Sequence, residues 1–192
     1  MPEFRRRPVL SVIGSGGALT GELEALSVEV GRLAIEAGFR VVTGGLGGVM
    51  EAVSRGAREA PSWREGDIVG ILPGYDRNTA NASVDIVIPS GMQMARNILV
   101  VSMADVVLAV GGGSGTLSEL ALAWQLGKPI LMLEPAGGWA SRFGGERLDH
   151  RHELPIQLAH SPAEAIAQAK ELLEVSRHEP GDIGSGWRRP LE

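Results

Sequence analysis

Hydrophobic residues in this chain fall into short, nearly continuous runs, separated by segments with a helical period. The runs cover residues 9–13, 39–43, 68–72, 84–88, 105–110 and 130–133. Continuous apolar runs are typical of strands that are covered on both faces, whereas a half-exposed strand would alternate apolar and polar positions. The pattern therefore predicts a parallel sheet built from these strands.

Several segments between the runs predict helices. The clearest spans residues 22–37, where the apolar positions share one face and Gly38 supplies a stop. Alternation of strand and helix indicates an α/β fold with an open parallel sheet and helices on both faces. In such sheets, ligands bind beyond the carboxyl ends of the strands.

The C-terminal third is less regular. The segment after residue 133 is rich in glycine and charge and has no period, so we expect a long surface loop, with residues 135–152 either a lid or a plain loop. Ser161, Pro162 and Glu164 form a helix start, and this last helix should run to about residue 175. We interpret residues 1–176 as one domain and 177–192 as a flexible tail.

Composition narrows the function classes. At 192 residues, the chain fits one domain. Its net charge of −5 and pI near 5.5 lack the basic footprint of a nucleic-acid binder. The absence of cysteine fits a reducing compartment without proving it, and no apolar run approaches the roughly 18 residues of a membrane span. We expect a cytoplasmic protein with neither a nucleic-acid nor a membrane partner.

Two glycine-rich loops each follow a predicted strand and open a predicted helix. The first, GGLGGVM at 44–50, carries Gly44, Gly45, Gly47 and Gly48, and the second, GGGSGTLSE, covers 111–119. Glycine lets the backbone approach a ligand, and the free N–H groups at a helix start favour an anion. The first loop matches neither the dinucleotide fingerprint nor the Walker motif, and a tight turn without a ligand is its alternative. Together, the loops predict a phosphate site.

The second loop contains the candidate chemistry. The hydroxyls of Ser114 and Thr116, with the N–H groups of residues 113–116, could surround a phosphate. Glu119 has two interpretations. With Thr116 as the helix cap, it stands where a capping-box glutamate bonds back to the backbone. Alternatively, its carboxylate faces the pocket, where it steadies a positive centre or activates water.

A third motif, GMQMARN at 91–97, predicts a helix that runs to about residue 103. Arg96 is a lone cation among apolar residues there, so it is either a surface arginine or needs an anionic partner, for which a phosphate or Glu119 would serve. The four histidines lack metal-ligand spacing, and we expect no metal site. The only lysines are Lys128 and Lys170.

The residues 44–50, Met92-x-x-x-Arg96 and 111–119 together resemble the LOG-like family of Rossmann-type nucleotide-binding proteins, long mislabelled as lysine decarboxylases. Its name-giving members are cytokinin riboside 5'-monophosphate phosphoribohydrolases. The similarity covers about 8–175 and implies a Rossmann-like fold, with Arg96 and Glu119 as catalytic residues. Expected phosphate or nucleotide contacts are Gly14, Ser15, Gly44, Gly45, Gly47, Gly48, Met92, Asn97, Gly112, Gly113, Ser114, Gly115 and Thr116.

Two positions depart from the hydrolase pattern. Gly111 stands where the motif has proline, and Asn97 follows the arginine where the hydrolases usually have lysine. The first glycine loop is also a shorter variant. These features resemble a bacterial subgroup of the family that is also similar to molybdenum-cofactor carrier proteins of the same fold.

Three functions follow from this resemblance. The first is an enzyme that cleaves the N-glycosidic bond of a purine nucleoside 5'-monophosphate and needs no cofactor, with Arg96 on the phosphate or base and Glu119 steadying the ribose cation and orienting water. The second is a non-catalytic carrier or sensor of a phosphorylated pterin, such as the molybdenum cofactor, or of a nucleotide. The third is a lysine decarboxylase, for which neither lysine is persuasive.

The resemblance also implies a homo-oligomer, a dimer or a tetramer. The methionines at 92, 94 and 103 would suit a contact between copies, and burial in the core is their alternative.

Overall fold

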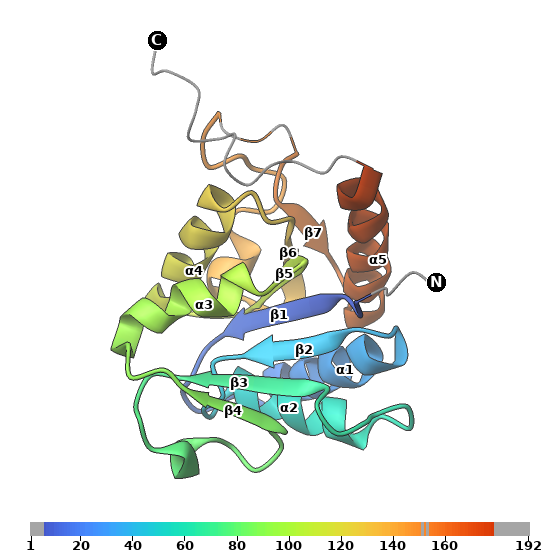
Figure 1. The fold of residues 1–192 in the computed structure, drawn as a ribbon. Coiled ribbons are helices and arrows are strands. Elements are labelled where there is room, and N and C mark those ends of the chain that lie inside the picture. Colours follow the sequence, from blue (N-terminus) through green and yellow to red (C-terminus); the bar gives the residue numbers. More distant parts are fainter. Residues whose placement is uncertain (1–5, 151, 153, 179–192) are drawn as a thin grey trace, which may run out of the picture.

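Parallel strands form one open sheet in the computed structural model, which describes residues 6–150, 152 and 154–178 (Figure 1). Within that part of the chain, the sheet has seven strands in the order β4-β3-β2-β1-β5-β6-β7, and every neighbouring pair is parallel. The strands are β1 (Val9–Gly14), β2 (Arg40–Thr43), β3 (Ile68–Leu72), β4 (Ile86–Pro89), β5 (Val106–Val110), β6 (Ile130–Leu133) and β7 (Gln157–Ala159). The predicted Rossmann-like α/β fold is confirmed.

Helices cover both faces of the sheet. On one face lie α1 (Gly21–Glu36), α2 (Val49–Glu59) and α5 (Pro162–His178), and on the other lie α3 (Asn97–Ser102) and α4 (Ser114–Gln125) (Figure 1). Every residue of β3, β5 and β6 is buried between these layers. This burial explains why the strands read as continuous apolar runs.

Helices α1 and α2 touch through two glycines. A Cβ atom on Gly31 would lie 2.0 Å from the carbonyl oxygen of Val53, and one on Gly56 would lie 1.9 Å from that of Val28. The first turn of α2 is also tied to the segment after β1, because the Val49 amide donates to the Ser15 carbonyl at 2.9 Å. The close contact places the first glycine loop beside the end of β1.

The fourth strand begins later than predicted. Its pairing with β3 starts at Ile86, and not at Val84. The preceding residue, Asp85, has a side chain that is only 2% exposed, and its carboxylate accepts the amides of Gly66 and Ile68 at 3.1 Å each. Asp85 therefore fastens the turn before β3 to the start of β4.

The sequence pattern missed β7, a three-residue strand that is too short to show a period. The segment before it is a loop with two 3₁₀ turns, η3 (Glu134–Ala136) and η4 (Gly138–Ser141). This loop is anchored, because the Trp139 amide donates to the Gly112 carbonyl at 3.3 Å and the Trp124 indole donates to Asp149 at 2.8 Å.

The last helix starts as predicted, with the Glu164 amide donating to the Ser161 hydroxyl at 3.2 Å. It runs to His178, so residues 177 and 178 are helical, whereas the rest of the predicted tail, 179–192, lies outside the described residues. Among the described residues, none of the helices is both long and apolar enough to cross a membrane.

Candidate functional site

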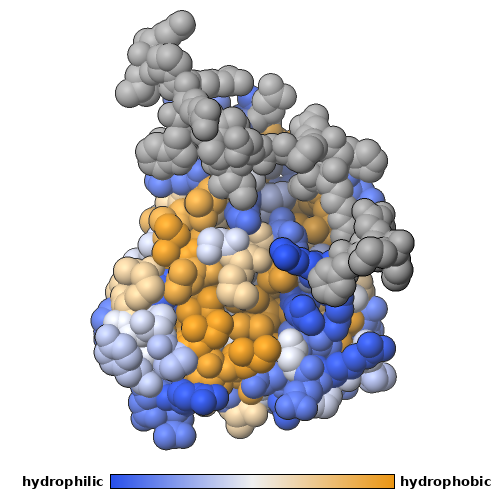
Figure 2. All heavy atoms as spheres, viewed as in Figure 1, coloured by the Kyte–Doolittle hydropathy of each residue, from blue (hydrophilic) through white to orange (hydrophobic). Residues whose placement is uncertain are grey.

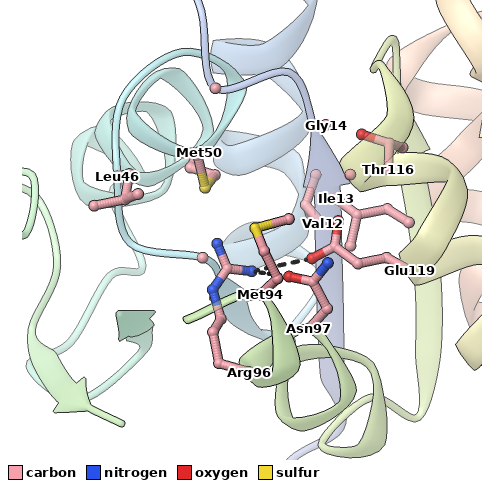
Figure 3. A pocket seen from close by; sticks show the side chains of 13 residues that line it. Val12, Ile13, Gly14, Leu46, Met50, Met94, Arg96, Asn97, Thr116 and Glu119 are labelled. Carbon is pink, nitrogen blue, oxygen red and sulfur yellow. Dashed lines mark hydrogen bonds and ion pairs between the residues drawn. The ribbon is translucent and has the colours of Figure 1, made fainter. Parts of the chain in front are cut away.

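A cleft of about 210 Å³ opens where β1 and β5 lie side by side (Figure 3). From β1 the sheet continues outward through β2, and from β5 it continues through β6, so the cleft lies at the point where the strand order reverses. Its lining residues are Val12, Ile13, Gly14, Gly16, Gly44, Leu46, Met50, Met94, Arg96, Asn97, Gly115, Thr116 and Glu119. Both glycine loops and the arginine motif therefore contribute to one site.

The first glycine loop leaves room for the arginine. A Cβ atom on Gly44 would lie 2.5 Å from Nη2 of Arg96 and 2.7 Å from the sulfur of Met50. Gly48, at the start of α2, has φ +67°, and a Cβ atom there would lie 2.3 Å from the Ser15 carbonyl. A side chain on Gly44 would displace Arg96 or Met50, whereas Gly48 meets backbone atoms at a positive φ and therefore requires glycine.

A buried ion pair forms the centre of the site. Arg96 ends the 3₁₀ turn η2 (Gln93–Arg96), and its Nη1 atom donates to Oε1 of Glu119 at 3.2 Å and to Oδ1 of Asn97 at 2.8 Å (Figure 3). The side chains of Arg96 and Glu119 are 11% and 8% exposed. Arg96 is therefore not a surface arginine, and its partner in the structure is Glu119, one of the two anions that the sequence suggested.

Burial controls the charge of Glu119. Loss of solvent raises the pKa of its carboxyl to about 7, against the opposing effect of the neighbouring Arg96 guanidinium. Among the described residues that line the cleft, only Arg96 and Glu119 are charged. A carboxyl that ionises near neutral pH beside a fixed cation is typical of functional sites.

The predicted role of Thr116 as a helix cap is wrong. Helix α4 begins two residues earlier, at Ser114, because Gly113 takes an extended backbone conformation and serves as the N-cap. Thr116 instead lies in the first turn, buried, and its hydroxyl has no hydrogen-bond partner. Because Thr116 is not the cap, the capping-box interpretation of Glu119 is also wrong. The Glu119 carboxylate instead accepts a hydrogen bond from Arg96.

A second polar atom is also unsatisfied. Nε of Arg96 is buried and has no partner, like the Thr116 hydroxyl. Buried polar groups in proteins are nearly always hydrogen-bonded, so each exception needs an explanation. Thr116 lies in the first turn of α4, which has no side-chain cap, and such a helix start favours an anion.

The predicted contact residues divide into two groups. Those that line the cleft are Gly14, Gly44, Arg96, Asn97, Gly115, Thr116 and Glu119. Those that lie beside it are Ser15, Gly45, Gly47 and Gly48 in the turns around α2, Gly112, Gly113 and Ser114 before and at the start of α4, and Met92, which is 42% exposed. The second group shapes the loops without lining the cleft.

Sequence reasoning missed six lining residues, namely Val12, Ile13, Gly16, Leu46, Met50 and Met94. Five are apolar, and an apolar residue that faces a ligand site looks the same in a sequence as one that faces the core. Gly16 alone had a signal, since it follows Gly14 and Ser15 directly after a strand.

Neither lysine reaches the cleft. Nζ of Lys128 donates to the Ala104 carbonyl at 2.7 Å, before the amino ends of β5 and β6, whereas the cleft lies at the carboxyl ends. Lys170 lies on α5. Within the described part of the chain, no three acidic or histidine side chains gather as a metal site would require.

Comparison with known proteins adds three findings. The model of the SLOG cluster4 family matches residues 7–170. The cytokinin riboside 5'-monophosphate phosphoribohydrolase of Mycobacterium tuberculosis is 35% identical over 124 residues, which cover 60% of this chain and 65% of that protein. Two solved structures are also similar, and the alignment with each covers 88% of this chain.

The first is the molybdenum cofactor binding protein of Rippkaea orientalis, which is 32% identical with a TM-score of 0.72 over 98% of its chain. The molybdenum cofactor carrier protein of Chlamydomonas reinhardtii is 31% identical with a TM-score of 0.71 over 99% of its chain.

Proposed function

The chain belongs to the SLOG cluster4 family, in agreement with the LOG-like resemblance of its motifs, and we propose that its cleft binds a small phosphorylated ligand. One observation carries the proposal: the Thr116 hydroxyl and Nε of Arg96 are both buried without partners. A phosphate group supplies acceptor oxygens for such donors, and hydrogen bonds to a charged group are strong.

The phosphate would lie at the first turn of α4, against Thr116 and the backbone of Gly115, with Arg96 on the facing wall. Leu46, Met50 and Met94 supply an apolar side for a flat ring, as in a purine base or a pterin. The volume of about 210 Å³ is below the ~300–1,000 Å³ of most ligand sites, so the ring would extend past the mouth of the cleft at Met94.

The first specific candidate is hydrolysis of a purine nucleoside 5'-monophosphate to free base and ribose 5-phosphate. The bond from C1' of the ribose to the base nitrogen breaks, the leaving base takes up a proton from solvent, and water adds its oxygen to C1' of the ribose cation and gives up a proton. Glu119 in its charged form would steady that cation and accept the proton of the water. The reaction as proposed needs no cofactor, and the name of the Mycobacterium relative supports it.

The second candidate is a carrier or sensor without turnover, holding a phosphorylated pterin such as the molybdenum cofactor, or a nucleotide. The solved structures named for that cofactor align over 98% and 99% of their chains. Glu119 is also paired with Arg96, which leaves it less free to orient water. The phosphate of such a ligand would accept hydrogen bonds from the unpartnered donors of Thr116 and Arg96.

Turnover distinguishes the two candidates. Purified protein is incubated with a panel of nucleoside 5'-monophosphates that includes N6-modified AMP, and free base is measured by chromatography. Glu119→Ala and Arg96→Ala are compared with Ser118→Ala, an exposed neighbour on the same helix. For a hydrolase, we expect base from the wild type and Ser118→Ala, and a loss of about 100-fold or more in Glu119→Ala.

If the wild type releases no free base, two results remain to be distinguished. If nucleotides or inorganic phosphate raise the melting temperature, or if denatured protein releases a pterin or nucleotide, the protein is a carrier or sensor. If no phosphorylated compound binds at all, the proposed function is overturned.

We also propose that the protein forms a homo-oligomer through an exposed apolar face (Figure 2). The face is defined by Tyr75, Ile86, Met92, Met94, Ile98 and Met103, which are 39% to 79% exposed. The methionines are therefore not core residues. Large exposed apolar patches mark interaction sites, and a second copy that covers this face would also border the cleft at Met94.

A further inference from the structure

One nitrogen of Arg96 is shared by two acceptors from different elements. Nη1 donates to Oδ1 of Asn97, the first residue of α3, at 2.8 Å and to Oε1 of Glu119, in α4, at 3.2 Å. Asn97 is 4% exposed, so its amide is as enclosed as the ion pair itself. Both acceptors therefore lie on the same side of the guanidinium, next to Nη1 (Figure 3).

The two acceptors respond differently to pH. Burial raises the pKa of Glu119 to about 7, so this carboxyl changes charge across the neutral range. The Asn97 amide keeps the same acceptor at every pH. A charge-assisted hydrogen bond is roughly twice as strong as a neutral one, so the hold of Glu119 on Arg96 weakens when the carboxyl gains a proton.

We propose that Asn97 is a positioning residue that keeps the Arg96 guanidinium in the cleft whether or not Glu119 carries a charge. The inference rests on the proposed function, because the reason to hold Arg96 is the anion that it binds. An anion meets less repulsion when Glu119 is neutral. That is also the state in which the hydrogen bond from Arg96 to Glu119 is weaker and the one to Asn97 is unchanged.

The surroundings add no competing charge. Among the other residues that line the cleft, β1 contributes Val12, Ile13 and Gly14, and the loop after β2 and helix α2 contribute Gly44, Leu46 and Met50. None of these residues titrates. Among the described residues that line the cleft, Glu119 is therefore the group whose charge changes near neutral pH.

The first test needs no ligand. Asn97→Leu removes the acceptor with little change in size, and Ser102→Ala is a control on the same helix. NMR relaxation of the Nε–Hε group of Arg96 is measured at about pH 5.5 and about pH 8.5, on either side of the Glu119 transition. We expect order at both values in the wild type and the control, but in Asn97→Leu order only at the higher pH.

Equal mobility of Arg96 at both values in Asn97→Leu, or no mobility at either, would overturn the inference. Asn97→Ala serves as a second variant. If neither variant folds, Asn97 is needed for folding and its assignment as a positioning residue also fails.

The second test uses sulfate, whose charge does not change over this pH range. Calorimetry should show that the wild type binds sulfate more tightly at about pH 5.5 than at about pH 8.5, and that Asn97→Leu binds about tenfold more weakly than the wild type only at the lower value. An equal loss at both values contradicts the inference. If the wild type binds no sulfate, the proposed anion site fails, while the NMR test still decides the role of Asn97.

Discussion

At the scale of single residues, Glu119 illustrates how much a side chain depends on its surroundings. The spacing from Thr116 to Glu119 suits both a capping box and a residue that faces a ligand, so the sequence left the choice open. The helix start at Ser114 decided it. Arg96 was more predictable, because a lone cation in an apolar segment needs an anion, and Glu119 lies 3.2 Å away.

The raised pKa of Glu119 predicts a pH-dependent stability. Between its usual 4.5 and about 7, the folded chain keeps a proton that the unfolded chain has released. The stabilising contribution is therefore complete below pH 4.5 and is lost as pH rises through about 7. In denaturant unfolding from about pH 4.5 to 8, the free energy of unfolding of the wild type should fall by about 2–3 kcal/mol relative to Glu119→Gln. A difference that stays constant with pH contradicts this.

At the scale of elements, the strands and helices follow from local pattern. Five of the six predicted strands match the structure within one residue at each end, because each is an apolar run buried on both faces. The sixth, β4, starts two residues later, where its pairing with β3 begins, and β7 was not predicted because it is only three residues long. The contact of α1 with α2 through Gly31 and Gly56 could not be predicted from the sequence pattern. It depends on how two separate helices pack, and a local period does not record that.

That contact predicts unequal effects of the same substitution. Gly56→Ala places a methyl group 1.9 Å from the backbone oxygen of Val28, and neither backbone can yield easily. We expect a loss of about 1–3 kcal/mol or more in the free energy of unfolding. Gly21→Ala, at the open start of α1, is the matched control. It should be neutral or stabilise by about 0.5–1 kcal/mol in the same thermal or denaturant unfolding experiment.

At the scale of the whole molecule, the apolar face and the cleft belong together. Met94 lines the cleft and is 69% exposed, so it is part of both surfaces. Helices α1, α2 and α5 cover the far face of the sheet, whereas α3 brings Ile98 and Met103 to the surface. A second copy on this face would bury apolar area and restrict the mouth of the cleft.

The proposed oligomer can be tested with charge. Ile98→Glu places a carboxylate on the apolar face, and Ala25→Glu places one on an exposed position of α1 as the control. Light scattering after size-exclusion chromatography should show an oligomer for the wild type and Ala25→Glu, and a shift toward monomer for Ile98→Glu, because burying an unpaired charge is costly. A monomeric wild type would contradict the proposal.

The sequence by itself determined the fold class, most strand and helix positions and the two glycine loops, and it marked Arg96 as a lone cation in an apolar segment. These features are local, since periodicity and glycine content depend on neighbouring residues. The roles assigned to Arg96 and Glu119 in catalysis, and to the glycines in phosphate binding, remain predictions.

Only the tertiary structure decided which of these residues share a cleft. Arg96 and Glu119 are 23 positions apart and meet only because α3 and α4 pack on the same face of the sheet. The helix start that frees Glu119, the acceptor role of Asn97 and the apolar lining residues likewise depend on contacts between distant segments. A local pattern carries no record of such contacts, because the same residues could serve the core, a cap or a site until the packing fixes their neighbours.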